Sequence, residues 1–155
     1  LMIISNKKLN VEFFDQPNYV TESKKKFENL LLEFLDFFSV AEINLEISFC
    51  TSSEIKKINK EFRSKDKPTN VLSFPDEEIK TVSNSCNGEI LICNEVLEKE
   101  AQDQDKDLLD HFQHLVIHSM LHILGYGHDE TNDAILMENK EVKFLSKIGI
   151  SDPYK

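Results

Sequence analysis

The sequence predicts an α+β fold in which a small mixed β-sheet packs with helices and a metal site lies at the end of a central, buried helix. Three observations support this prediction. Segments of alternating apolar residues are interspersed with segments of helical periodicity, without a regular strand–helix repeat. The chain of 155 residues is long enough to bury a core, so we expect residues 1–155 to form a single domain. Three of its five histidines fall within residues 118–128, at the end of an apolar helical segment.

The first part of the chain is expected to form two strands and two helices. A short apolar strand lies around residues 2–5, and residues 21–38 repeat apolar side chains at the spacing of an amphipathic helix. Residues 43–50 alternate apolar and polar side chains, as a half-buried strand does. The sequence TSSE at 51–54 has the form of a capping box, so a second helix begins there. We expect this helix to turn three apolar side chains inward: Ile55, Ile58 and Phe62.

Two further strands and three helices are expected after Pro68. The strands are NVLSF at 70–74 and EILIC at 89–93, separated by a polar loop at 76–88. The expected helices are a short one capped by Asn94 and running through Glu100, one of about five turns from near Asp107 to Leu124, and a last one from near Thr131 to Gly149. Gly125 suits the left-handed position that terminates the second of them.

The composition indicates a reduced, cytoplasmic protein. With 40% hydrophobic and 30% charged residues, no window approaches the roughly 20 apolar residues of a membrane-spanning helix. The amino terminus has an apolar run too short for a secretory signal, and we expect no membrane partner. The cysteines contain no CxxC pair and leave one unpaired, so they are interpreted as small core or strand residues: Cys50, Cys86 and Cys93.

The charge is uneven along the chain. A net charge of -10 argues against the overall basic surface of a nucleic-acid binder, and no DNA partner is expected. Residues 56–67 nevertheless hold six basic and two acidic side chains. The lysines of this segment either bind phosphates of RNA or form one solvated helix face: Lys56, Lys57, Lys60, Lys65 and Lys67.

Four histidines share one face of the helix predicted at 107–124. At 100° per residue they fall within a sector of roughly 80°: His111, His114, His118 and His122. His118 and His122 are an i, i+4 pair, which can bind one zinc ion from adjacent turns, and His128 can return as a third ligand after Gly125.

The motif HxxxHxxGxxH predicts a zinc site with one open coordination position, as catalytic sites have. A purely structural site would need a fourth ligand, for which Cys93, Asp129 and Glu130 are the candidates. Metzincin proteases share this spacing but carry a general-base glutamate after the first histidine. Ser119 occupies that position here, and a serine hydroxyl cannot take a proton from zinc-bound water near neutral pH.

Arg63 is the only arginine in the chain. Its planar guanidinium can hold a phosphate with two hydrogen bonds and stays charged when partly buried. Considered alone, Arg63 is better interpreted as part of a surface ion pair with Asp66 or Glu61.

Three stretches together resemble the YbeY family of bacterial endoribonucleases, which are rRNA maturation factors. They are NKEFRSKDKPTNVLSFP at 59–75, GEILIC at 88–93 and HLVIHSMLHILGYGHDE at 114–130, and the terminal GISDPYK fits as well. The resemblance covers roughly residues 45–150. The histidine motif alone also occurs in unrelated zinc proteins, whereas its combination with RxKxKPTNVLSFP is specific.

The resemblance implies a compact metal-dependent hydrolase that cuts single-stranded RNA. Its partners would be rRNA and the small ribosomal subunit, in maturation of the small-subunit rRNA 3′ end and in ribosome quality control. It also implies that the metal ligands are His118, His122 and His128, that Arg63 is the functional arginine, and that His114 lines the cleft.

This sequence departs from the family at three positions. The family commonly has Gly where Ser119 stands, Asp where Gly127 stands, and Asp where Glu89 stands. None of these changes removes a ligand, but the loss of the Asp at Gly127 is expected to alter either a contact to one of the metal ligands or the turn that holds His128.

Two other functions fit the residues. One is a zinc-stapled ribosome-binding factor without catalysis, and the other is a zinc peptidase that lacks the usual glutamate base. Three histidines also accept nickel or copper in place of zinc. The sequence leaves open whether water or the 2′-hydroxyl of the substrate attacks the phosphate.

Overall fold

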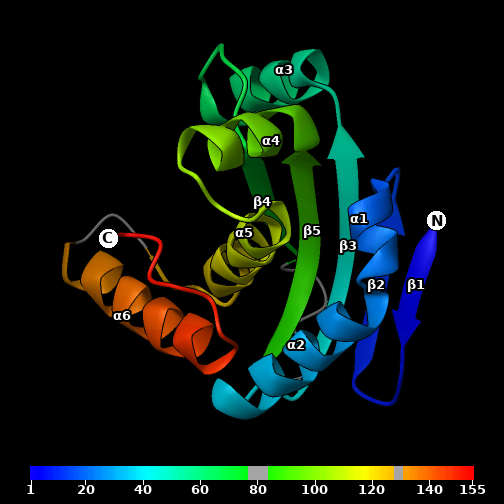
Figure 1. Cartoon of the computed structure of the whole chain (residues 1–155), viewed down its shortest axis with the longest axis vertical. Coiled ribbons are helices and arrows are strands. Elements are labelled where there is room, and N and C mark those ends of the chain that lie inside the picture. Colours follow the sequence, from blue (N-terminus) through cyan, green and yellow to red (C-terminus); the bar gives the residue numbers. More distant parts are fainter. Residues whose placement is uncertain (77–83, 128–130) are drawn as a thin grey trace.

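The computed structural model describes residues 1–76, 84–127 and 131–155. In this part of the chain, five strands form one sheet in the order β1-β2-β3-β5-β4, with helices packed around it (Figure 1). The elements are β1 Met2–Ser5, β2 Leu9–Phe14, α1 Asn18–Glu22, α2 Lys24–Phe37, β3 Glu42–Cys50, α3 Ser52–Arg63, β4 Val71–Pro75, β5 Ser85–Cys93, α4 Asn94–Asp103, α5 Leu108–Ile123 and α6 Thr131–Lys147.

The sheet is mixed. β2 pairs with β3 and β3 with β5 in parallel, whereas β1 and β4 lie antiparallel to β2 and β5 at the two edges. The predicted α+β fold with a small mixed sheet is therefore confirmed.

The main core lies between one face of the sheet and helices α2 and α5. The alternating residues of β3 that the sequence predicted to be apolar and inward are buried there, together with an aromatic cluster from three elements. Phe27 of α2 contacts Phe13 of β2 and Phe112 of α5 with ring centroids 5.4 and 5.6 Å apart. Phe144 of α6 contacts Phe34 of α2 at 5.5 Å, so α6 closes the far side of α2.

Helix α3 packs on the opposite face of the sheet, at the end where β3 and β5 finish (Figure 1). Its predicted capping box is present: the Thr51 hydroxyl accepts from the amide of Glu54 at 3.2 Å, and the Glu54 carboxylate accepts from the amide of Thr51 at 3.0 Å. Ile55 is buried against Leu72, but Phe62 is 61% exposed, so the prediction that Phe62 points inward is wrong. Phe62 lies in the last turn of α3, where its ring meets the Phe74 ring edge-on with the centroids 5.3 Å apart.

The sequence prediction missed two elements near the amino terminus. Strand β2 alternates buried and partly exposed residues, so its signal was present in the sequence. The five-residue helix α1 is too short to produce a periodic pattern, and α2 begins only at Lys24.

The predicted polar loop at 76–88 is wrong for its last residues, because β5 begins at Ser85. Polar residues are stable in this part of β5 because they hydrogen bond to β3: the Asn44 amide donates to the Asn87 oxygen at 2.7 Å. Asn94 is not the cap of α4; Cys93 is, and the amide oxygen of Asn94 accepts from the Tyr19 hydroxyl at 2.7 Å.

The remaining helix ends also differ slightly from the prediction. α4 continues to Asp103, beyond the expected Glu100, and α6 ends at Lys147, before Gly149. α5 has the predicted extent, with Asp107 as its cap and Gly125 at φ 102° after it. The described part of the chain contains no helix long and apolar enough to cross a membrane.

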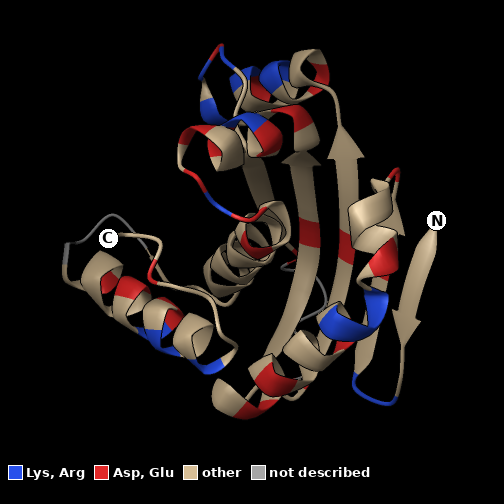
Figure 2. Ribbon diagram, viewed as in Figure 1, with Lys and Arg blue, Asp and Glu red and all other residues tan. Residues whose placement is uncertain are grey.

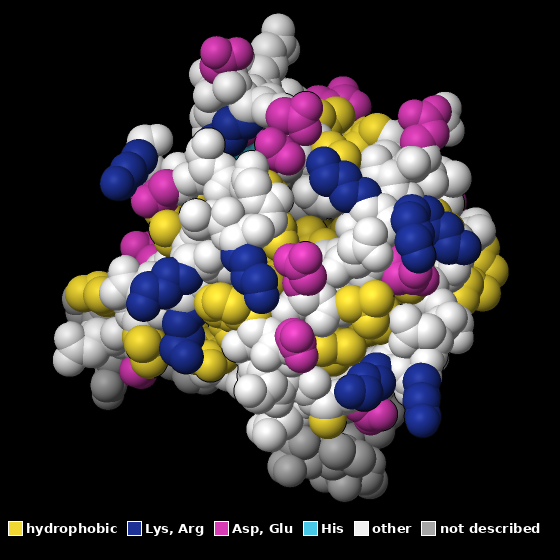
Figure 3. Space-filling model, turned by 60° about the horizontal axis from the view of Figure 1, so that its bottom comes forward, with side chains coloured by type: hydrophobic (Ala, Val, Ile, Leu, Met, Phe, Trp, Pro, Cys, Tyr) yellow, Lys and Arg dark blue, Asp and Glu magenta, His cyan; other side chains and the backbone are white. Residues whose placement is uncertain are grey.

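Basic and acidic side chains are distributed unevenly over the surface. Basic side chains concentrate on α3 and the segment that follows it (Figure 2). The face in Figure 3, by contrast, intersperses basic, acidic and hydrophobic side chains.

Candidate functional site

Helix α5 carries the histidine stripe into a cleft of about 620 Å³. The helix starts at Asp107, whose carboxylate accepts from the amide of Asp110 at 3.0 Å, and its other faces are buried in the core. Three of the four histidines of the stripe line the cleft: His114, His118 and His122. His111 does not, because its ring turns toward Glu100 of α4.

The rings of His118 and His122 meet at their Nε2 atoms, which are 3.0 Å apart. The Nδ1 atom of His118 lies 2.9 Å from the Glu141 carboxylate, and Nδ1 of His122 lies 3.2 Å from the carbonyl oxygen of Tyr126. Both partners only accept hydrogen bonds, so each ring carries its proton on Nδ1 and leaves a lone pair on Nε2. The lone pairs on the two Nε2 atoms therefore face each other and repel. A cation bound between them would remove this repulsion.

These two imidazoles fit a zinc ion. Zinc with Zn–N distances of roughly 2.0–2.1 Å in tetrahedral geometry places two ring nitrogens about 3.3 Å apart. The observed 3.0 Å needs only a small opening of the pair. Burial lowers the pKa of His122, and the neighbouring His118 lowers it further, so the neutral form that binds a metal is favoured.

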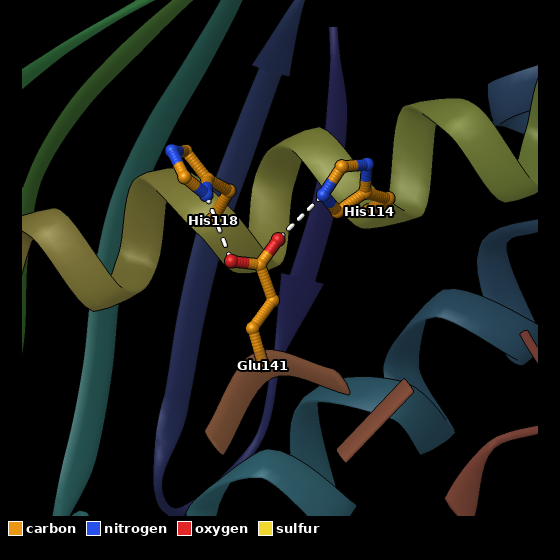
Figure 4. A group of neighbouring side chains, drawn as sticks. All are labelled: His114, His118 and Glu141. Carbon is orange, nitrogen blue, oxygen red and sulfur yellow. Dashed lines mark hydrogen bonds and ion pairs between the residues drawn. The ribbon is translucent and has the colours of Figure 1, made fainter. Parts of the chain in front are cut away.

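Glu141 of α6 supports this pair from below. Its carboxylate is fully buried and accepts three hydrogen bonds, from His114 Nε2 at 2.5 Å, His118 Nδ1 at 2.9 Å and the Tyr154 hydroxyl at 3.1 Å (Figure 4). Burial acts to raise the pKa of Glu141, but the hydrogen bonds from His114 and His118 outweigh it and lower the pKa to about 2. The carboxylate therefore stays charged and fixes the orientation of His118.

A second metal-compatible group exists among the described residues. His114, His118 and Glu141 each offer a ligand atom, and these atoms lie within 4.8 Å of one another. In this group the carboxylate oxygens already accept from ring N–H groups. The Nε2 atoms of His118 and His122, by contrast, carry lone pairs that face each other across the cleft wall, and Glu141 accepts from the far side of the His118 ring.

The third predicted ligand, His128, lies outside the described residues, as do the alternative ligands Asp129 and Glu130. Cys93, the remaining candidate for a fourth ligand, is buried beneath α3, with its sulfur 3.5 Å from the Ser52 hydroxyl. It does not line the cleft. The free cysteines lie in or beside the core as predicted.

Arg63 lines the same cleft as the histidines of α5. It is the last residue of α3, which ends because Ser64 takes a left-handed conformation with φ 58°. The exposed guanidinium donates to the carbonyl oxygen of Ser73 at 3.3 Å. Within the described residues it makes no ion pair with Asp66 or Glu61, so the alternative reading of Arg63 as half of a surface salt bridge is not supported.

The predicted RNA-binding lysines all lie exposed on α3 and the segment after it (Figure 2). Lys60 is 4.0 Å from Asp66, a distance at which the ion pair is weak. None of these lysines lines the cleft, so they flank Arg63 outside the histidine site.

The three departures from the family pattern have different surroundings. Ser119 is fully buried, and its hydroxyl has no hydrogen-bond partner in the described structure. Gly127 has φ 78°, and a Cβ there would lie 2.4 Å from the Met137 sulfur and 2.9 Å from the His122 ring. An aspartate would therefore require the turn to rearrange. Glu89 lines a different cleft, on the polar face of the sheet, and does not reach the histidines.

Sequence reasoning missed three residues of the site. Glu141 and Tyr154 come from α6 and the carboxyl-terminal segment, and Asn70 lines the cleft just before β4. Glu141 carried a weak signal, since it is an acidic residue among the positions that α6 buries, between Met137 and Phe144. Tyr154 belongs to GISDPYK and Asn70 to the PTNVLSFP stretch, but neither had an assigned role.

Comparison with known proteins shows which proteins this chain resembles. The family model described as Endoribonuclease YbeY matches residues 9–149. A protein named Endoribonuclease YbeY from Francisella tularensis subsp. tularensis (strain WY96-3418) is 41% identical over 156 residues, covering 94% of this chain and 93% of its own. A relative of the same name from Francisella tularensis subsp. novicida (strain U112) is 44% identical over 137 residues, covering 82% and 83%. The solution structure of TM1509 from Thermotoga maritima is similar with a TM-score of 0.59 and 25% identity, covering 94% of this chain and 99% of its own.

Proposed function

The chain belongs to the endoribonuclease YbeY family, and on that premise we propose that it is a zinc-dependent endoribonuclease specific for single-stranded RNA. We further propose that it acts in the cytoplasm on rRNA of the small ribosomal subunit, in 3′-end maturation and ribosome quality control. Its curated relatives carry the name endoribonuclease, which supports RNA as the substrate.

One observation carries the metal part of the proposal. The Nε2 lone pairs of His118 and His122 face each other at 3.0 Å because acceptors fix both Nδ1 protons. His118 and His122 would hold the zinc ion, with His128 as the proposed third ligand. A zinc ion held by three histidines acts as a Lewis acid toward a phosphate oxygen and lowers the pKa of water to about 7.

The side chains of the cleft supply the remaining chemistry. Arg63 binds the phosphate and stabilises the negative charge that develops on it in the transition state. His114 lines the cleft and its Nε2 atom donates to the Glu141 carboxylate, and we assign proton transfer to this hydrogen-bonded ring. The nucleophile is either water or the 2′-hydroxyl of the substrate.

The exposed lysines of α3 and the following segment are proposed to bind phosphates on both sides of the cleaved position: Lys56, Lys57, Lys60, Lys65 and Lys67. Lys56, Lys60 and Arg63 are spaced i, i+4 and i+7 and lie on one face of α3. Binding that depends on such contacts weakens as the salt concentration rises.

The zinc-peptidase alternative is disfavoured because Ser119, where a peptidase would have its base, is fully buried and is not a carboxylate. The other alternative is a ribosome-binding factor whose zinc only staples the fold. It makes a different prediction for Arg63, which is exposed and contacts only a backbone carbonyl.

The test compares wild type with Arg63→Ala in cleavage of a single-stranded RNA, with metal content measured by elemental analysis on the same samples. We expect about one zinc per chain in both proteins and a loss of cleavage of at least 100-fold in the variant. Lys8→Ala removes the same charge from an exposed position in the turn between β1 and β2 and serves as the control. It should cleave as wild type does.

If wild type and Arg63→Ala both hold zinc and cleave equally, the assignment of Arg63 is wrong. If both hold zinc and neither cleaves, the metal is structural and the ribosome-binding alternative stands. Cleavage of a peptide by the purified wild type would support the peptidase instead.

A further inference from the structure

Asn70 lies at the rim of the histidine cleft with its side-chain amide held on one side. Its Nδ2 atom donates to both carboxylate oxygens of Glu100, at 3.1 and 3.3 Å. Its backbone is fixed as well, because its carbonyl oxygen accepts from the amide of Cys93 at 3.0 Å. Asn70, which comes just before β4, is therefore held by Cys93 at the end of β5 and by Glu100 in α4.

Glu100 determines which end of the Asn70 amide is free. A carboxylate only accepts hydrogen bonds, so the NH₂ group of Asn70 must face it. The amide oxygen is left without a partner in the described structure, and Asn70 is among the residues that line the cleft. The Asn70 amide oxygen is therefore available to accept a hydrogen bond from a ligand in the cleft.

His111 holds Glu100 in place. Its Nε2 lies 3.0 Å from Glu100 Oε1, and the ring is only 5% exposed. Because a carboxylate only accepts, Nε2 of His111 must donate to it. This hydrogen bond explains why His111, although it belongs to the histidine stripe, does not line the cleft. His111, Glu100 and Asn70 form one chain of hydrogen bonds from α5 through α4 to β4.

The Asn70 oxygen can bind only a group that donates a hydrogen bond. A phosphate group offers only acceptors when ionised, so it cannot bind the Asn70 oxygen. The partner must be a donor on the RNA, either the 2′-hydroxyl of a ribose or an N–H group of a base. The N–H donors of the four bases differ in position, so no single base donor is present in every RNA sequence. The 2′-hydroxyl is present in every ribonucleotide and absent from DNA.

We propose that Asn70 is a specificity-determining residue that accepts a hydrogen bond from a ribose 2′-hydroxyl, and that Glu100 and His111 are its positioning residues. This inference rests on the proposed function, because it concerns the same cleft. It assigns the distinction between RNA and DNA to a residue that binds neither metal nor phosphate.

The test is a 2′-deoxy scan of a short single-stranded RNA, in which one nucleotide at a time lacks its 2′-hydroxyl. A neutral hydrogen bond contributes about 1 kcal/mol, or about fivefold in kcat/KM or in Kd. With wild type, we expect one position near the cleaved bond where the deoxy substitution costs about fivefold. With Asn70→Ala, the all-ribose RNA should lose about the same factor, and the deoxy substitution at that position should cost nothing further.

Binding of RNA in the presence of a chelator is measured alongside cleavage, because a 2′-hydroxyl that serves as nucleophile would also be revealed by the cleavage scan. A nucleophile affects cleavage in wild type and Asn70→Ala alike, whereas the contact proposed here disappears only in the variant. Zinc content should be unchanged.

Glu100→Gln tests the positioning residues without touching the RNA. The substitution places an NH₂ group against the NH₂ group of Asn70, which removes the constraint on the amide, so the deoxy penalty should shrink toward that of Asn70→Ala. Glu98→Gln makes the same change at an exposed position of α4 and should retain the full penalty. If Asn70→Ala does not fold, Glu100→Gln and Glu98→Gln carry the comparison.

The outcomes separate the two proposals. If wild type neither binds nor cleaves RNA, the proposed function fails. If wild type cleaves RNA but the deoxy penalty is the same in wild type, Asn70→Ala and Glu100→Gln, the role of Asn70 is refuted while the nuclease stands. A penalty that follows the base and not the sugar would also refute it.

Discussion

Replacing Glu141 by glutamine should weaken zinc binding although Glu141 is not assigned as a ligand. The carboxylate accepts from His114, His118 and Tyr154, and the bond to His118 Nδ1 at 2.9 Å directs Nε2 of that ring toward His122. A glutamine has one acceptor oxygen and an NH₂ group. That NH₂ group would face a ring N–H or force His118 to turn.

The size of the effect follows from this geometry. Losing the carboxylate behind a metal-binding histidine typically lowers metal affinity by about 10- to 100-fold, or about 1.4–2.8 kcal/mol. At least one buried donor also loses its acceptor, which should lower the free energy of unfolding by about 1–3 kcal/mol without metal. Because the pKa of Glu141 is lowered to about 2, the carboxylate is charged in any buffer near neutral pH, and the assay pH does not change the comparison.

Zinc affinity is measured by competition with a fluorescent chelator, and unfolding by urea titration with excess chelator. Glu138→Gln makes the same change at an exposed position one turn earlier in α6 and should alter neither quantity. An unchanged zinc affinity in Glu141→Gln would refute the orienting role. A loss far beyond 100-fold would instead make Glu141 a ligand, together with His114 and His118.

Three other results are expected. Lys60→Gln should lower RNA affinity and reduce the slope of log affinity against log salt by about 0.7, whereas Lys25→Gln, on α2, should leave the slope unchanged in binding titrations. Phe27→Ala should lower the free energy of unfolding in urea by about 3–5 kcal/mol, because the ring is buried in the aromatic cluster, and Phe37→Ala, at a 38% exposed position, should cost much less. Burial raises the pKa of Cys86 from 9.0 to about 12. The unfolded chain releases this proton first, so the free energy of unfolding should fall as pH rises from 9 toward 12, and alkaline titrations of Cys86→Ala should show a smaller fall.

The juxtaposition of the His118 and His122 rings could be predicted from the sequence because it depends on local geometry. His118 and His122 are one helical turn apart, so any helix through them brings the rings together. The capping box at Thr51 and the end of α5 at Gly125 were predictable for the same reason, since each depends on a few consecutive residues. Arg63 was recognised as unusual by composition, but its place at the cleft required the resemblance.

The supporting residues could not be predicted because they depend on tertiary packing. Glu141 meets His118 only after α6 packs against α5, and no periodicity in the sequence encodes that contact. Asn70 and Glu100 are 30 residues apart and meet where β4 begins beside α4. Phe62 has the helical spacing of a core residue, but it lies in the last turn of α3 and is 61% exposed, because its packing depends on which tertiary neighbours reach that turn.

The parallel pairing of β3 with β5 has a consequence for when activity first appears. Glu42 pairs with Ser85 and Cys50 with Cys93, so the centre of the sheet joins segments 43 residues apart and encloses α3 and β4 in the loop between them. Closing such a loop is entropically costly, so this step is expected to come late in folding. Arg63 lies within this loop, and the histidines follow it in the chain. A nascent chain emerging from the ribosome therefore carries an incomplete cleft until α5, α6 and Tyr154 have been synthesised, and the proposed cleavage of RNA is expected only after that point.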